Sequence, residues 1–157
     1  MTETALDLAG LLEEQKTLEL SSFDYDLAWE LGSRIRQRAQ SEGLPVAIEI
    51  RHGNDIVFAT LARGATIDNF DWVRRKCAVV HRFHRSSLAV RVEAEHQGYD
   101  FNARFRLPVG DYAASGGGVP LILKGAFVGS VGVSGLPHLD DHKLAVDCIK
   151  EMIQRHA

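Results

Sequence analysis

The residues with the clearest chemical signature form one glycine-rich run, Ser115, Gly116, Gly117 and Gly118. Consecutive residues without a Cβ atom allow positive φ angles, and their backbone N–H groups can converge on an anion, a carboxylate or a carbonyl oxygen. The run is not a phosphate-binding Walker loop, because the lysine of that motif is absent and an apolar strand follows. We predict that these four residues contact a ligand; the alternative is a tight strand connection or a contact with another subunit.

Arg74 and Arg75 lie in the most basic segment of the chain, Trp-Val-Arg-Arg-Lys at residues 72–76. A guanidinium group can hold an anion through two parallel hydrogen bonds, so both arginines are candidate ligand-binding residues. Adjacent side chains of a helix project in different directions, and the whole run therefore cannot face one ligand. The alternative is a solvated helix face or a subunit contact.

The chain contains 7 histidines, which is many for its length. His81 and His84 are three residues apart and His138 and His142 are four apart, so each pair can share a helix face. No HExxH or other zinc pattern is present, and we predict no metal-ion site. Haem needs only a single axial ligand from the protein, which is fewer residues than a zinc site requires. His81 or His84 is the candidate for that role, because apolar and cationic residues share their helix.

Nucleophilic catalysis has weaker support. Ser115 and Ser134 each adjoin a glycine, but the GxSxG motif of hydrolases is absent, and hydroxyl groups that bond turn backbone are the preferred explanation. Cys77 and Cys148 lie far apart within apolar helical patterns and form no CxxC pair. We predict that both are buried, reduced thiols.

The composition is that of one globular domain spanning residues 1–157, with 45% hydrophobic and 25% charged residues. The 18 basic and 21 acidic residues give a net charge of -3, which argues against a dedicated nucleic-acid binder. No apolar stretch is long enough to span a membrane, and the first residues are acidic where a signal peptide is basic. The sequence therefore predicts a cytoplasmic protein with neither nucleic acid nor membrane as a partner.

The elements that position these residues begin with two helices. Apolar residues recur at helical spacing over residues 4–20, with Thr4 or Asp7 as the cap, and again over residues 24–43, with Asp24 as the cap. A glycine and a proline follow the second segment and end it.

After this segment the spacing of apolar residues changes from that of a helix to that of short strands. Residues 46–50 and 56–61 are short β-rich runs, and the Gly-Asn pair between them predicts a hairpin. A long helix is then predicted from a cap at Asp68 or Asn69 to about His84.

The rest of the chain supplies another helix, a second hairpin and a closing helix. Residues 88–96 fit a helix, although part of the segment also alternates like a strand. Residues 119–124 and 127–133 are nearly continuous apolar strands, which is typical of burial on both sheet faces. A helix over residues 139–155, capped by Asp140 or Asp141, ends the chain. Strands that arrive as hairpins, interleaved with helices, predict an α+β fold with an antiparallel central sheet covered by helices on both sides.

Two glycine-rich motifs also carry a family resemblance. Residues 115–122 (SGGGVPLI) and 125–135 (GAFVGSVGVSG) resemble the haem-degrading, GlcG/HbpS-like domain family. Residues 72–76, the Arg-Phe and Ser-Ser pairs at 82–87, and Gly-Leu-Pro followed by Asp-His at 135–142 are similar to its UPF0303 branch. The resemblance covers nearly the whole chain. It implies a profilin-like three-layer α/β/α fold with a central antiparallel sheet, and assembly into a homo-oligomer.

The resemblance implies haem as the cofactor to test and supplies no set of catalytic residues. Three functions stay open at this point: a haem-associated, small-molecule-binding homo-oligomer, a small hydrolase- or transferase-like enzyme that uses the glycine loop with an arginine or histidine, and an oligomeric scaffold. The aromatic residues Phe23, Tyr25 and Trp29 are expected to be exposed, which supports self-association. We also expect Gly117 to be sterically constrained, whatever the loop contacts.

Overall fold

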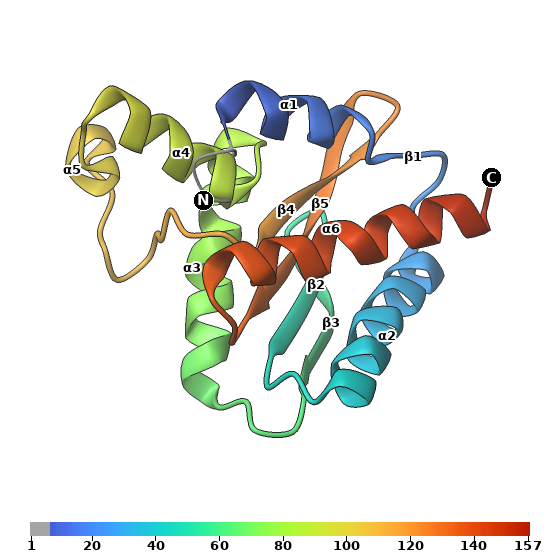
Figure 1. The fold of residues 1–157 in the computed structure, drawn as a ribbon. Helices are drawn as coiled ribbons and strands as arrows, with labels where there is room; N and C mark the ends of the chain where they lie inside the picture. Colours follow the sequence, from blue (N-terminus) through green and yellow to red (C-terminus); the bar gives the residue numbers. More distant parts are fainter. Residues whose placement is uncertain (1–6) are drawn as a thin grey trace.

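A five-stranded sheet runs through the centre of the computed structural model, which describes residues 7–157 (Figure 1). Six helices accompany the five strands in this part of the chain. The helices are α1 (Leu8–Lys16), α2 (Tyr25–Glu42), α3 (Ile67–Phe83), α4 (Ser87–Gln97), α5 (Phe101–Phe105) and α6 (His138–Arg155). The strands are β1 (Glu19–Leu20), β2 (Ala47–His52), β3 (Asp55–Leu61), β4 (Gly118–Leu123) and β5 (Ala126–Ser134).

The sheet has the strand order β1-β4-β5-β2-β3. The two predicted hairpins, β2–β3 and β4–β5, are present, and an antiparallel β2–β5 pair joins them. The short strand β1 pairs with β4 in parallel, so the expectation of a wholly antiparallel sheet is wrong at this edge. The sequence pattern merged β1 with the first helix, which in fact ends at Lys16 with Thr17 as its C-cap.

Helices cover both faces of the sheet and produce three layers (Figure 1). Helices α2 and α6 pack against one face and against each other, and α3 packs against the other face. The main apolar core lies on the α2–α6 side, and β4 and β5 are buried along most of their length. The predicted α+β fold with an α/β/α layering is confirmed.

Smaller helices extend the α3 layer. Helix α4 packs against α3 and α1, which confirms a helix rather than a strand at residues 88–96. Helix α5 was not predicted, and its aromatic residues pack with Phe83 and Tyr99 in a separate apolar cluster. No helix among residues 7–157 is both long and apolar enough to cross a membrane.

Helices α1 and α2 start at predicted caps, whereas α3 and α6 do not. The side chains of Asp7 and Asp24 accept hydrogen bonds from the backbone of their first turns, at 2.7 and 2.8 Å, whereas Thr4 lies outside the described residues. Helix α3 is capped by Thr66 instead of Asp68 or Asn69, because Asn69 acts as the third residue of a capping box. Helix α6 is capped by Pro137, so Asp140 and Asp141 lie in its first turn.

The expected aromatic surface is only partly exposed. Tyr25 and Trp29 are 63% and 64% exposed, as predicted. Phe23 is buried and its ring stacks on His52 with the centroids 5.1 Å apart, so the expectation of exposure is wrong for this residue. The turn before α2 directs Phe23 into the core, while the start of α2 leaves Tyr25 and Trp29 outside.

Candidate functional site

The glycine loop enters β4 at the point where the strand passes under α3. Gly117 has a φ of +134°, and a Cβ atom there would overlap the carbonyl oxygen of Val133 and lie 2.9 Å from Lys76 Nζ. A Cβ atom on Gly118 would lie 2.8 Å from a methyl group of Val80. The glycines therefore allow β4 to approach β5 and α3 closely, in agreement with the expected steric constraint at Gly117.

Two N–H groups of this loop bond within the protein. Gly116 N–H donates to Nδ1 of His138 at 3.0 Å, and Gly118 N–H donates to Oγ of Ser87 at 2.9 Å. These two groups therefore do not form the open anion cradle that a glycine run can provide. The loop instead fixes the ring of His138 and shapes the surface next to it.

A buried ion pair lies directly against the loop. Nζ of Lys76 in α3 is 3.0 Å from Oδ2 of Asp141 in α6, and it also donates to the carbonyl oxygen of Val133 in β5 at 3.2 Å. The side chains of Lys76 and Asp141 are 3% and 1% exposed. Leu136 N–H donates to the second carboxylate oxygen at 3.0 Å. The pair thus connects α3, β5 and α6 behind the glycine loop.

Burial favours the uncharged form of both members of the pair. It lowers the pKa of the Lys76 ammonium group and raises the pKa of the Asp141 carboxyl group, because each charged form loses its hydration. The attraction between the two groups opposes both shifts. Sequence reasoning missed this pair, since Lys76 counted only as part of a basic run and Asp141 only as a helix cap.

A cavity of about 330 Å³ opens beside the pair. Its wall combines charged, hydroxyl, amide and imidazole groups with one indole ring. The lining residues are Asn69, Trp72, Lys76, Ser115, Ser134, Gly135, Leu136, His138 and Asp141. Ser115 is thus the glycine-loop side chain that the structure places at a cavity.

Arg74 and Arg75 do not join this site, and neither lines the cavity. Arg74 bonds Asp71 at 2.7 Å and Asp111 at 3.2 Å, and Arg75 bonds Asp71 at 2.9 Å while its guanidinium lies 4.1 Å from the Trp72 ring centroid. The two arginines lower the pKa of the Asp71 carboxyl through hydrogen bonds and charge. Both predicted anion-binding groups are therefore paired with carboxylates of the protein itself.

His81 and His84 form a second region, at the C-terminal end of α3. Both rings contact Phe127 of β5: the His84 ring is parallel to it at 4.2 Å, and the His81 ring is nearly perpendicular at 5.0 Å. Nε2 of His81 is 2.8 Å from the hydroxyl oxygen of Ser130. His84 is exposed, and it closes the helix in the left-handed conformation, with a φ of +56°. We refer to His81, His84 and Phe127 as the histidine–phenylalanine cluster.

The imidazole of His81 is held neutral. Burial is the largest cause of its shift, and the nearby charge of Arg51 adds to it, so the pKa falls to about 4. A neutral imidazole is the form that ligates a metal. The cluster therefore pairs one neutral, half-buried ring with one exposed ring on the same phenyl group.

The remaining candidate residues are a second histidine pair and two cysteines. His138 and His142 do not act together, since His138 accepts from Gly116 and His142 bonds Glu14 of α1 at 2.8 Å. Cys77 and Cys148 are buried free thiols, and burial raises the pKa of Cys77 to about 12 and that of Cys148 to about 11. Within residues 7–157, no three His, Cys, Asp or Glu side chains are grouped so that they could hold a metal ion.

Structural comparison places the fold among solved proteins. The crystal structure of the Ybr137w protein matches with a TM-score of 0.89 and 27% identity, over 96% of this chain and 90% of that one. HbpS of Streptomyces reticuli, solved as a double mutant, matches with a TM-score of 0.68 and 18% identity, over 86% and 89% of the two chains. A PduOC:Heme complex matches with a TM-score of 0.69 and 18% identity, over 85% and 96%. The last two show likeness of fold.

Sequence comparison identifies the family. A UPF0303 protein of Burkholderia thailandensis is 44% identical over 148 residues, which cover 94% of this chain and 90% of the relative. A UPF0303 protein of Pseudomonas entomophila is 40% identical over 146 residues, covering 92% and 81%. The family model for the haem degrading protein HbpS-like matches residues 23–150. The chain therefore belongs to the HbpS-like haem-degrading family and, within it, to the UPF0303 proteins.

Proposed function

We propose that this chain is a haem-associated, small-molecule-binding domain that acts as a homo-oligomer, with haem bound at the histidine–phenylalanine cluster. The observation that carries the proposal is the exposed ring of His84, stacked on Phe127 beside the neutral ring of His81. The name of the family model and the haem complex of a structural neighbour support haem as the ligand.

The residues at the cluster suit the chemistry of the group. Haem iron takes imidazole as an axial ligand, and a porphyrin face packs on apolar and aromatic side chains. His84 is the ligand candidate because its ring is exposed, whereas Nε2 of His81 is bonded to Ser130. Arg82 is exposed on the same helix and can pair with a propionate. When bound, haem would supply a redox-active iron; the chain itself binds and orients it.

The test is a haemin titration followed by the Soret band. The wild-type protein is expected to give a saturable Soret shift. His84→Ala is expected to abolish the shift, and His81→Ala to weaken affinity several-fold, because it loosens the Phe127 surface without removing the axial ligand. His96→Ala is the matched control: this histidine is exposed on α4, outside the cluster, and its replacement should leave the titration unchanged.

Two results would count against the proposal. If His84→Ala and His96→Ala titrate alike, the cluster is not the haem site. If the wild-type protein gives no saturable shift, haem is not the ligand. In that case a stable assembly that binds neither haem nor small molecules would favour a scaffold role.

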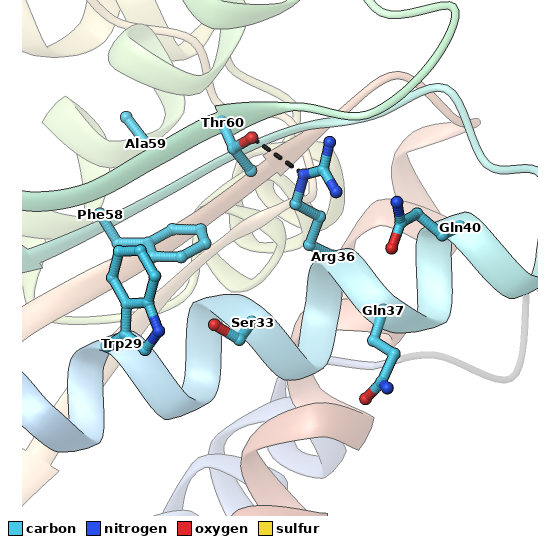
Figure 2. A pocket seen from close by; sticks show the side chains of 8 residues that line it. All are labelled: Trp29, Ser33, Arg36, Gln37, Gln40, Phe58, Ala59 and Thr60. Atoms are coloured by element: carbon cyan, nitrogen blue, oxygen red, sulfur yellow. Dashed lines mark hydrogen bonds between the residues drawn. The ribbon is translucent and has the colours of Figure 1, made fainter.

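The homo-oligomer part of the proposal rests on the surface around β3. This strand is the last in the sheet order, so one of its edges pairs with no strand in the described residues. Figure 2 shows Trp29 of α2 beside Phe58 of β3, and their rings are 5.3 Å apart at the edge of an open cavity of about 500 Å³. Tyr25 and Ile56 are also exposed nearby, at 63% and 56%. An unpaired strand edge flanked by exposed aromatic residues is typical of a subunit interface.

Light scattering at micromolar concentration tests this part. A mass above 17.4 kDa is expected for the wild-type protein, and Trp29→Glu should reduce it. Val109→Glu, at an exposed position in the loop before the glycine run, is the control that should not. A wild-type protein that scatters as one 17.4 kDa species would disprove self-association.

A further inference from the structure

The Lys76–Asp141 pair takes no part in the proposed haem surface, yet it is the most completely buried ion pair of the described chain. We propose that Lys76 is a nucleophilic amine that forms a reversible imine with a small aldehyde or ketone bound in the cavity beside the glycine loop. Imine formation at Lys76 is independent of haem binding at the histidine–phenylalanine cluster.

The location of the pair favours a role in ligand chemistry. A buried ion pair stabilises a fold no better than apolar residues of the same volume, so packing alone does not explain its presence. Lys76 and Asp141 line a cavity of about 330 Å³, a volume that suits a metabolite-sized compound. Gly117 lets the loop backbone pack closely against the amine, since a Cβ atom there would lie 2.9 Å from Nζ.

The two groups of the pair also have the chemistry that imine formation requires. An amine attacks a carbonyl carbon only in its neutral form, and desolvation of a buried lysine is one of the means by which proteins obtain that form. Burial lowers the pKa of Lys76, and the Asp141 oxygen at 3.0 Å is placed to accept its proton. A carboxyl group whose pKa burial raises can then return that proton to the oxygen of the ligand.

The reaction balances without an oxidant, a reductant or a metal. The Nζ lone pair forms a bond to the carbonyl carbon, and the carbonyl oxygen leaves as water with the two hydrogen atoms that the neutral amine loses. Asp141 carries protons from nitrogen to oxygen. Ser115 and Asn69 line the same cavity and offer hydrogen bonds to a polar substituent, while Trp72 provides an apolar wall. The predicted ligand is therefore a small carbonyl compound with a polar group.

The experiment uses the wild-type protein, with pyruvate and acetaldehyde as separate probes. Each is incubated at pH 7, the imine is reduced with sodium borohydride, and labelled lysines are located by peptide mass spectrometry. Lys16, Lys124, Lys143 and Lys150 are the other lysines of the chain and serve as internal controls. We expect Lys76 to be labelled severalfold more than any of them with at least one probe, saturably, because burial lowers the pKa of its ammonium group and the amine lines the cavity. The preference should disappear in urea.

Labelling of Lys76 at or below the level of exposed Lys124, with both probes, would overturn the proposal. Asp141→Asn tests the partner, with far-UV circular dichroism as the check on folding, and should slow labelling about tenfold. Asp140→Asn changes the exposed neighbour on the same helix turn and should not. Equal rates in these two variants would exclude proton transfer by Asp141. His84→Ala should label as wild type, so failure of the haem proposal and failure of this one are distinguishable.

Discussion

Helix α3 carries two chemically distinct regions that differ in how the protein surrounds them. Lys76 is enclosed between β5, α6 and the glycine loop, and its charge is balanced inside the protein by Asp141. Five residues further along the helix, the histidine–phenylalanine cluster begins, where the rings of His81 and His84 each contact Phe127 and His84 is exposed. The enclosed region depends on the balance of charge for its stability, whereas the exposed cluster depends on ring packing and solvation. Mutations should therefore separate the two.

The largest expected effect comes from unbalancing the enclosed pair. Lys76→Met leaves the buried Asp141 carboxylate without a cationic partner, and this should lower the free energy of unfolding at pH 7 by about 3–5 kcal/mol. The double variant Lys76→Met/Asp141→Leu should recover most of the loss. Urea unfolding of the three proteins gives the comparison. A double variant as unstable as the single one would show that the charge imbalance is not the cause.

The same single variant has a pH dependence with a defined sign. Burial already raises the pKa of Asp141 in the presence of Lys76, and loss of the ammonium group raises it further. The folded-state pKa then lies above the unfolded-state value, so the folded state binds more protons. The variant should therefore gain stability relative to wild type as the pH falls from 7 toward about 4.

The next effect concerns the glycine loop. Gly117→Val combines a φ of +134° with overlap against the carbonyl oxygen of Val133, and should cost about 1–3 kcal/mol in unfolding free energy. Gly125→Val is the matched control, since Gly125 has a φ of +85° but a Cβ atom there would meet nothing within 4 Å beyond its chain neighbours. The difference between the two melting curves isolates the close approach of β4. Equal losses would mean that backbone conformation alone constrains Gly117.

A smaller effect is expected from His81. Its folded-state pKa of about 4 lies below the ordinary value of 6.5, so its stabilising contribution is complete above pH 6.5 and is lost as the pH falls toward 4. After allowance for solvent screening at this half-buried site, the loss is about 1 kcal/mol. Unfolding of wild type and His81→Gln at pH 7 and pH 5 measures it. Parallel pH profiles would contradict the neutral state assigned to this ring.

The smallest effect should come from Arg74. Its partners are the exposed carboxylates Asp71 and Asp111, and exposed ion pairs contribute little. Arg74→Ala should change stability by less than about 0.5 kcal/mol and leave both the Soret titration and the labelling of Lys76 unchanged. A large loss of signal in either assay would show that Arg74 takes part in ligand binding.

Local signals in the sequence were sufficient for most of the fold. The caps Asp7 and Asp24, the Gly-Asn turn and the apolar hairpin strands each act over a few residues, and the structure confirms them. Strand β1 was missed because two residues are too few to show a period, and its partner in β4 is about a hundred residues away.

The candidate site was less accessible to sequence reasoning. Lys76 and Asp141 are 65 residues apart, and only the packing of both α3 and α6 against β5 brings them together. The bond between His81 and Ser130 spans 49 residues and is equally invisible to local patterns. In contrast, the pairing of Asp71 with Arg74 and Arg75 follows the i,i+3 and i,i+4 spacing of a helix. That spacing was the available sign that both arginines pair with a carboxylate of the protein itself.

Helix α1 controls how firmly the turn that carries His84 is held. It precedes the segment matched by the family model, and Leu11 packs with Leu88, Ala89 and Val92 in a small cluster apart from the main core. The Gln15 side chain donates to the carbonyl oxygen of His84 and accepts from the backbone of Ser86, so α1 fastens the turn that presents His84. Segments with few buried contacts open locally at low free energy, and amide hydrogen exchange should detect such opening in α1 before the sheet exchanges. Each opening would release the His84 turn while the rest of the fold stays closed.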